Sequence, residues 1–346
     1  TIRHIPRVLY HWRATQTSTS INHDQKGYAH EAGRQALQGC FERNSIEVSV
    51  HDGDINYSYR VKKQIGFQPS ISVLMWSEAE GNDSLLLQRM MAETLYDNCD
   101  FILINAAEIQ EPGSGGRLEK LPGERLYRVG AEPDETKARG FARAVSLSES
   151  DYLVFLDSSV VSVDGGWLDE LVNQMVLLQA GCVCGRVSYS GGDGISYTLP
   201  DVDSASAGYY RDFLTSCSRH LNGLHHQQQI RFASWDVCIL RRSEFERLGG
   251  FDHQCYPTLF AMTDFALRAS ENGLETFYTP YAKVFCDESA GERTGGETTE
   301  SQEEKRRFQQ AWKKLLCQGD PYYNLGVLDD NNIDRERFAA WFTGEN

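Results

Sequence analysis

The fold is decided by residues 151–171, DYLVFLDSSVVSVDGGWLDEL. The apolar run Tyr152–Leu156 is rich in aromatic and β-branched residues, which predicts a buried strand. The strand ends at Asp157, and a helix is expected to begin near Trp167 after a second apolar step, Val160–Val163. Ligands of open α/β sheets bind outside the carboxyl ends of the strands, so Asp157 is placed for chemistry. The alternative is that Asp157 only caps a turn, since Asp is a favoured turn residue.

On both sides of this stretch, strands and helices alternate. Strands are predicted by apolar runs at 70–76, 100–105, 125–129 and 181–188. Helices are predicted at 82–96, 135–148 and 166–179. This β-α-β-α-β alternation predicts an α/β fold with a mixed, mainly parallel sheet and helices on both faces.

Composition and charge restrict the class of partner. The 346 residues allow one large or two smaller domains, and 40% hydrophobic with 24% charged residues are typical of a globular protein. The net charge of −15 argues against nucleic acid or an anionic membrane as the main partner, because both bind cationic surfaces. No apolar run approaches the roughly 18 residues of a membrane span, and no signal peptide is recognised. Nine cysteines without a CxxC pair indicate reduced thiols. We expect a cytoplasmic protein, with peripheral attachment to the inner membrane through partners as an open alternative.

A strand that ends in acidic residues before a Trp-Leu helix resembles the metal-binding centre of family 2 glycosyltransferases with the GT-A fold. The stretch 233–289 continues the likeness in the family's order: a strand ending in Arg, GGFD, an Asp before Leu-Arg, a Gly, and a strand with Thr-Pro. DPYYNLGVL, at 320–328, resembles the closing signature of the rhamnosyltransferase-like subgroup. The ordered series carries the resemblance, which covers 65–328 and implies a GT-A domain.

The first 60 residues resemble the C-terminal end of another family 2 glycosyltransferase domain, one that would precede the GT-A domain in the chain. The likeness is carried by HIPRVLYHWR at 4–13 and YAHEAGRQAL at 28–37. In the family the His before Trp-Arg closes the active site; here it is His11, for which a structural role is the alternative. A helix is predicted at 28–43, and the polar stretch 52–63 predicts a linker. We therefore expect a preceding tail with its linker at 1–60, a GT-A domain at 65–328 and a C-terminal tail at 329–346, together the C-terminal part of a multi-domain protein.

By this resemblance, three residues would contact the donor nucleotide. They are Glu78 and Asp157, each just past the carboxyl end of a predicted strand, and Asn105, the last residue of another. Asn105 stands where the family has an Asp, so it keeps hydrogen bonding and loses the charge. Such contacts position the base and ribose for transfer.

The resemblance also implies a divalent cation, Mn²⁺ or Mg²⁺, that neutralises the diphosphate leaving group. Here Ser159 replaces the last Asp of the metal motif, and Cys286 replaces the closing His. Ser is a poor substitute for a carboxylate ligand of these ions. The candidate ligands that remain are Asp157, Asp287 and Glu288, and the alternative is a site without metal.

The base and acceptor positions are altered as well. Met262 stands at the position of the family's catalytic Asp, and a thioether cannot accept a proton. Asp264 is the remaining candidate base, and general base catalysis is worth about 10²–10⁴ in rate. Trp235 and Asp236 are candidates for contacting an acceptor sugar. For Trp235 the alternative is core packing, because aromatic residues bury large apolar areas.

Two functions follow as expectations. The first is a sugar-nucleotide-dependent, inverting glycosyltransferase (hexosyl or rhamnosyl transfer) of polysaccharide or glycan biosynthesis, with a degenerate active site and reduced or lost turnover. The second is a non-catalytic scaffold or glycan-binding module of a larger glycosyltransferase. Expected partners are a nucleotide-sugar, a glycan acceptor and other glycosyltransferase domains of the same protein. The absence of a GxGxxG after the first strand argues against a third function, that of a dinucleotide-binding oxidoreductase.

Overall fold

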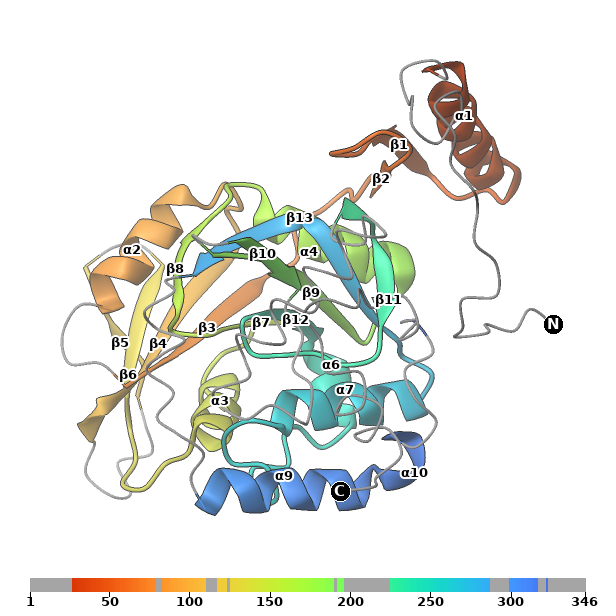
Figure 1. Cartoon of the computed structure of the whole chain (residues 1–346). Helices are drawn as coiled ribbons and strands as arrows, with labels where there is room; N and C mark the ends of the chain where they lie inside the picture. Colours follow the sequence, from red (N-terminus) through yellow and green to blue (C-terminus); the bar gives the residue numbers. More distant parts are fainter. Residues whose placement is uncertain are drawn as a thin grey trace.

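The computed structural model describes residues 27–78, 83–109, 117–122, 125–189, 192–195, 225–286, 299–316 and 322. Its body is a large sheet with helices on both faces, and an N-terminal helix and hairpin stand at one side of that body (Figure 1). Several predictions fall outside the described residues: His11, Asp287, Glu288, most of the signature at 320–328, and the tail at 329–346.

The central sheet is mixed. Its strand order is β11-β13-β9-β12-β7-β3-β4-β6-β5, with β10 paired to β9 and β8 paired to β13. The bounds are β3 (Ile71–Ser77), β4 (Cys99–Ile109), β5 (Glu119–Lys120), β6 (Leu126–Ala131), β7 (Tyr152–Leu156), β8 (Val160–Val163), β9 (Cys182–Tyr189), β10 (Gly192–Ile195), β11 (Gln228–Ile230), β12 (Val237–Arg241) and β13 (Thr276–Cys286).

Most strands on this path run in one direction. The strands β3, β4, β6 and β7 are mutually parallel, and so are β9 and β13. Strand β12 lies antiparallel between β7 and β9, so these two groups also point the same way. The predicted α/β class with a mixed, mainly parallel sheet is confirmed, and the arrangement is consistent with the GT-A fold.

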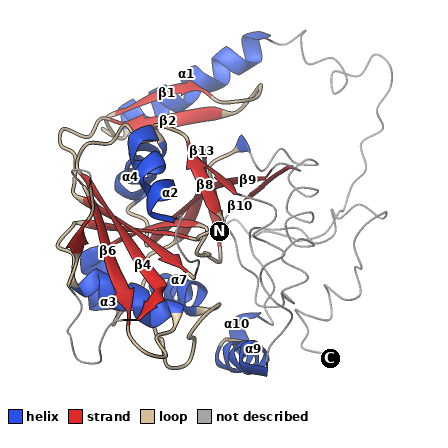
Figure 2. Ribbon diagram, turned by 90° about the vertical axis from the view of Figure 1, so that its left-hand side faces the viewer, coloured by secondary structure: helices blue, strands red, loops and turns tan. Residues whose placement is uncertain are grey.

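Helices cover both faces of the sheet (Figure 2). On one face lie α2 (Asp83–Glu93) and α4 (Trp167–Leu178), and on the other α3 (Lys137–Ser146), α6 (Arg242–Arg247), α7 (Ala261–Glu271), α9 (Thr299–Ala311) and α10 (Lys313–Leu316). Side chains alternate across a strand, so Leu74 and Trp76 of β3 join one core cluster while Val73 and Met75 join the other. With both faces covered, every residue of β3 is buried.

Residues 52–63, predicted as a linker, form most of a β-hairpin, and this prediction was wrong. Strand β1 (Val48–Asp52) pairs antiparallel with β2 (Tyr59–Lys63), and α1 (Gly27–Arg43), close to its predicted bounds, packs against β1. The segment looks like a linker because its side chains make polar contacts rather than a core.

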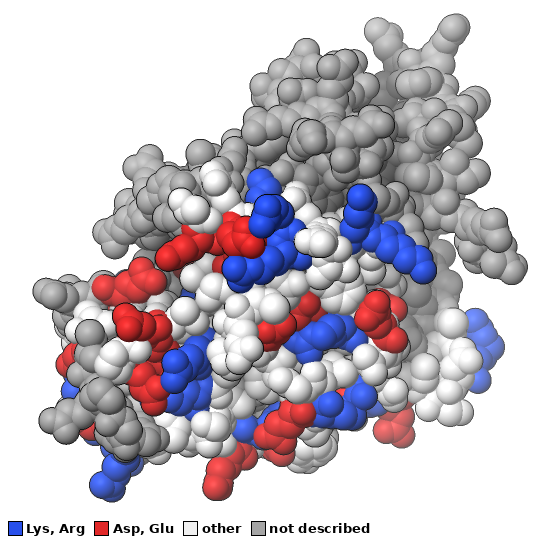
Figure 3. Space-filling model, turned by 90° about the horizontal axis from the view of Figure 1, so that it is seen from below, with Lys and Arg blue, Asp and Glu red and all other residues white. Residues whose placement is uncertain are grey.

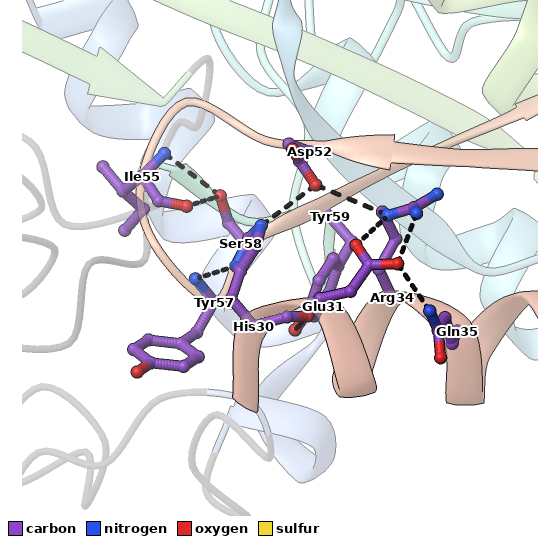
Figure 4. A network of polar contacts seen from close by, with 9 residues as sticks. All are labelled: His30, Glu31, Arg34, Gln35, Asp52, Ile55, Tyr57, Ser58 and Tyr59. Carbon is purple, nitrogen blue, oxygen red and sulfur yellow. Dashed lines mark hydrogen bonds and ion pairs between the residues drawn. The ribbon is translucent and has the colours of Figure 1, made fainter. Parts of the chain in front are cut away.

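The link between α1 and the hairpin is one polar network, drawn in Figure 4. His30 of α1 lies 2.9 Å from the carboxylate of Asp52 and accepts a hydrogen bond from the Tyr57 N–H at 2.8 Å. The Tyr59 hydroxyl donates to the His30 carbonyl at 2.8 Å, and the Tyr59 and His30 rings stack. The helix and hairpin therefore form one unit held by side chains from both.

The surface and the thiols agree with the composition. Figure 3 shows acidic and basic side chains interspersed over the lower face of the described molecule, without the one-signed patch that an anionic polymer needs. Every cysteine in the part of the chain that the structure describes is free, and most are buried. No described helix is both long and apolar enough to cross a membrane.

Candidate functional site

The predicted site residues Asp157 and Asp236 meet at the carboxyl edge of β7. Asp157 directly follows β7, and Asp236 directly precedes the antiparallel β12, so the two residues lie side by side. The Asp157 backbone N–H donates to the Asp236 carbonyl at 3.5 Å. Met75 is in register with Leu156, so β3 carries Trp76–Glu78 past the same edge. This is the edge at which open α/β sheets bind ligands.

Asp157 is held by a lysine. The ammonium of Lys137 pairs with its Oδ2, and the Ser159 backbone N–H donates to its Oδ1 at 3.0 Å. Burial acts to raise the pKa of Asp157, but the charge and hydrogen bond of Lys137 outweigh it and hold that pKa below its ordinary value. The carboxylate is therefore ionised and has a resident cation.

Lys137 was not identified from the sequence, although its ammonium forms an ion pair with the carboxylate of Asp157. It is the first residue of α3, its side chain is 16% exposed, and its ammonium lies 5.7 Å from the centre of the Trp235 ring. The sequence does place this lysine at the start of the helix that precedes the strand before Asp157. That position alone does not indicate an ion pair with Asp157, because lysines at helix ends are common on protein surfaces.

The pKa of Asp236 is shifted in the opposite direction to that of Asp157. Burial, and then the charge of Asp157, raise its pKa, while a 2.6 Å hydrogen bond from the Ser234 hydroxyl works against them. Two adjacent carboxyls thus have pKa values that are pushed apart, which is a pattern of functional sites.

Ser159 and Cys286, the two residues at the altered metal-ligand positions, lie close together. Strand β8 pairs with the end of β13, and the Ser159 hydroxyl lies 3.6 Å from the Cys286 sulfur. Burial, and then the charge of Asp236, raise the pKa of the Cys286 thiol, which stays protonated and is a weak ligand in that form.

The described residues do not fit the divalent cation that the resemblance implies. Both oxygens of Asp157 are already bonded, and Ser159 and Cys286 offer only a hydroxyl and a thiol. Within the described ranges, no three His, Cys, Asp or Glu side chains gather closely enough to hold a metal ion.

Glu78 and Asn105 stand at the same edge with local partners. The exposed Glu78 accepts a hydrogen bond from the Trp76 indole at 3.1 Å. Asn105 is in register with Ser77 and accepts from the Ala107 N–H at 3.0 Å, where the pairing of β4 with β6 becomes irregular. Glu78 follows β3, and Asn105 lies on β4 opposite the last residue of β3.

The candidate base has a structural role. Asp264 is buried; its Oδ2 accepts from Arg268 at 2.8 Å and its Oδ1 from the Trp312 indole at 3.0 Å. Arg268 also donates to the carbonyls of Leu248 and Gly250, so the group ties α7 to the Gly-Gly turn. Met262, at the family's base position, is completely buried. Neither residue offers a free carboxylate to an acceptor.

Trp235, predicted with Asp236 to contact an acceptor sugar, packs in the core instead. Trp235 is only 6% exposed and belongs to the core. Its ring stacks on Phe141, with centroids 4.9 Å apart, and its indole donates to the Thr258 carbonyl at 3.0 Å. Burying the large ring in an aromatic cluster is the core-packing alternative, and only Asp236 of the predicted acceptor pair reaches the site.

A pocket of about 400 Å³ lies at the other end of the strands, lined by residues that include Ser70, Asp100, Arg125 and Ser148. It is separated from Asp157 by the length of β7, so it is not part of the site at the carboxyl edge.

Comparison with known proteins gives distant similarities. No family model matches the chain. It is 26% identical over 358 residues to the uncharacterized protein y4gI of Sinorhizobium fredii, and 23% identical over 326 residues to the O-antigen biosynthesis protein RfbC of Myxococcus xanthus. These alignments cover 96% and 93% of this chain but only 37% and 25% of the relatives, so the chain spans a minor part of their length.

Two solved structures are also similar. One is the mannosyltransferase PcManGT from Pyrobaculum calidifontis in complex with GDP-Man and Mn²⁺, with a TM-score of 0.42, 15% identity, and coverage of 74% of this chain and 65% of that chain. The other is GalNAc-T7 with UDP, GalNAc and Mn²⁺, with a TM-score of 0.46, 14% identity, and coverage of 69% and 47%.

Proposed function

We propose that this chain is a sugar-nucleotide-dependent glycosyltransferase-like domain of a polysaccharide or glycan biosynthesis protein, with reduced or lost turnover. One observation carries the proposal: Asp157 and Asp236 meet at the ligand-binding edge of an α/β sheet whose sequence motifs follow the family's order. The similarity to a protein named for O-antigen biosynthesis supports the biosynthetic setting.

The reaction class proposed is inverting hexosyl or rhamnosyl transfer, with reduced turnover because the base is altered. Met262 cannot take a proton, and Asp264 is engaged by Arg268 and Trp312. Loss of a general base costs about 10²–10⁴ in rate. Asp236 is the carboxyl next to Asp157 at this edge, so residual transfer would use it to accept the proton of the acceptor hydroxyl.

The second candidate is a non-catalytic scaffold or glycan-binding module within a larger glycosyltransferase. The structural bonding of Asp264 favours it, since this residue is committed to the fold. The longer relatives support other domains of the same protein as partners. In either case we propose a cytoplasmic setting, with contact to the inner membrane through those partners.

Calorimetry distinguishes the two candidates. The protein is titrated with UDP, GDP and dTDP, and then with the matching nucleotide-sugars. We expect one nucleotide to bind, with an affinity that changes in Asp157→Ala and is retained in Asp169→Ala, which alters an exposed residue of α4. Absence of binding to every nucleotide by the folded protein would exclude the donor site and leave the scaffold or glycan-binding module.

A further inference from the structure

We propose that the ammonium group of Lys137 takes the place of the divalent cation at Asp157, so that a nucleoside diphosphate binds at this edge without a metal ion. The part of this proposal that concerns nucleotide binding rests on the proposed function. The part that concerns replacement of the divalent cation rests on the Lys137–Asp157 ion pair alone.

The first step is the occupancy of Asp157. Its Oδ2 is paired with Lys137 and its Oδ1 accepts the Ser159 N–H at 3.0 Å. A metal ion bound here would have to share the carboxylate with the Lys137 ammonium or displace it. It would also place a double positive charge next to an ammonium, and this repulsion is strong in a partly buried site.

The second step is the chemistry of the neighbouring side chains. Mg²⁺ and Mn²⁺ prefer carboxylate, carbonyl and water oxygens. At this edge the positions of the expected ligands are taken by a hydroxyl and a thiol, Ser159 and Cys286, which face each other at 3.6 Å. Asp236 is engaged by the Ser234 hydroxyl at 2.6 Å. The described donors suit a hydrogen-bonded ammonium better than a hard cation.

The third step is the capacity of Lys137 to bind an anion. An ammonium has three N–H donors, and Asp157 uses one of them. The Lys137 side chain is 16% exposed, and α3 together with the Trp235 ring fixes its position. Lysine is a common phosphate ligand that acts as a point charge. Because its charge is shared with Asp157, we expect weaker binding than a divalent ion would give, and sensitivity to salt.

Titration with Mn²⁺ tests the cation directly. The fall in the electron paramagnetic resonance signal of free Mn²⁺ reports metal uptake by the full chain. In the natural protein we expect no saturable Mn²⁺ uptake that depends on Asp157. The Lys137→Met variant should take up more Mn²⁺ than the natural protein. One Mn²⁺ bound per chain and lost in Asp157→Asn would overturn the inference, whatever the nucleotide does.

Nucleotide titrations complete the test. With the nucleoside diphosphate that binds, we expect affinities in EDTA and in Mn²⁺ to agree within about twofold. Lys137→Met should weaken binding by about tenfold or more, the value of one charge-assisted hydrogen bond. The control is Lys283→Met, which removes a lysine that is also partly exposed and paired, here with Asp54 at 3.4 Å.

The outcomes separate this inference from the proposed function. Nucleotide binding that requires Mn²⁺ would overturn the inference and leave the function standing. Absence of both nucleotide binding and Mn²⁺ uptake would overturn the function and the nucleotide part of the inference, while supporting the exclusion of the metal by Lys137. An unchanged nucleotide affinity in a folded Lys137→Met variant would contradict the role of the ammonium as the phosphate partner.

Discussion

The carboxylate of Glu304, on α9, binds the amino-terminal end of α7. It accepts hydrogen bonds from the backbone N–H groups of Leu259 and Phe260, both at 2.8 Å, and from the Thr258 hydroxyl at 2.6 Å. Glu304 is 1% exposed, and a negative charge at a helix amino terminus is stabilising. Helix α9 thus fixes α7, the helix that holds the family's base position.

Replacing Glu304 by Ala should lower the free energy of unfolding by about 2–4 kcal/mol, because it leaves buried N–H groups without an acceptor. Urea denaturation measures the loss. The control is Glu303→Ala, which removes a 39% exposed neighbour paired with Arg306 and Arg307 and should leave the free energy of unfolding nearly unchanged. Equal losses for the two variants would contradict the role of Glu304 as the anchor of α7.

A second buried carboxylate attaches the N-terminal hairpin. Glu170 of α4 is 2% exposed and pairs with Arg60 and, at 3.1 Å, with Lys62 of β2. In Glu170→Ala the two partly exposed cations lose their shared partner, and a hydrogen bond to a charged group is worth about 1.5–3 kcal/mol. We expect amide hydrogen exchange over 48–63 to accelerate by about a hundredfold while β3 stays protected.

Asp169→Ala is the matched control for Glu170, since it removes the adjacent but exposed acidic residue of the same helix. It should leave exchange over 48–63 unchanged. If Glu170→Ala instead accelerates exchange over β3 and the hairpin equally, the hairpin is an inseparable part of the main fold rather than a separately attached unit.

The body of the fold could be predicted because its strands are dense apolar runs between polar turns. Tyr152–Leu156 was predicted to the residue, since a fully buried strand has no competing periodicity. Gly273, predicted to end a helix, has a φ of +79°, a conformation that favours glycine. The hairpin β1–β2 was missed because its burial pattern shows no continuous core face.

The site was harder to predict, because its pairs join residues that are distant in the chain. Lys137 is 20 residues from Asp157, and its only signal is its place at the start of the helix before that strand. The same limit applies to Trp312, which bonds Asp264 from 48 residues away. One local signal existed, because Asp264 and Arg268 are spaced as an i,i+4 ion pair on a helix, which favours a structural role.

Gly140 sets the close approach of α3 to β3. A Cβ at this position would lie 2.3 Å from the Cζ3 atom of the buried Trp76 ring. Gly140→Ala should therefore destabilise the protein by about 1–3 kcal/mol through overpacking. The new Cβ should also displace the Trp76 ring, whose indole donates to Glu78 at 3.1 Å, and this displacement should weaken nucleotide binding.

Thermal unfolding and calorimetry of Gly140→Ala test both effects. The control is Gly39→Ala in α1, where the nearest atom to the new Cβ is the flexible Arg43 guanidinium at 3.2 Å. There, alanine should stabilise the helix by up to about 1 kcal/mol. A Gly140→Ala variant as stable as the natural protein would show that α3 can move away from β3 at little cost.

The two adjacent aspartates should affect stability with opposite dependence on pH. Burial and the charge of Asp157 raise the pKa of Asp236 above its ordinary value of 3.8. Between that value and the raised one, the folded protein binds more protons than the unfolded chain, so stability falls as pH rises through this window. Asp236→Asn cannot titrate, and its stability relative to the natural protein should be higher at pH 7 than at pH 4.

Asp157→Asn is the matched comparison, because Lys137 outweighs burial and lowers the pKa of Asp157. A lowered pKa contributes stability above the ordinary value of 3.8, and this is lost as pH falls through the folded value. The stability of Asp157→Asn relative to the natural protein should therefore be lower at pH 7 than at low pH. Denaturant unfolding measures the two trends, for Asp236→Asn from pH 4 to pH 7 and for Asp157→Asn from pH 7 down to pH values below 3.8. If the relative stabilities of both variants change in the same direction with pH, Lys137 does not stabilise the ionised form of Asp157 while leaving Asp236 without a cation.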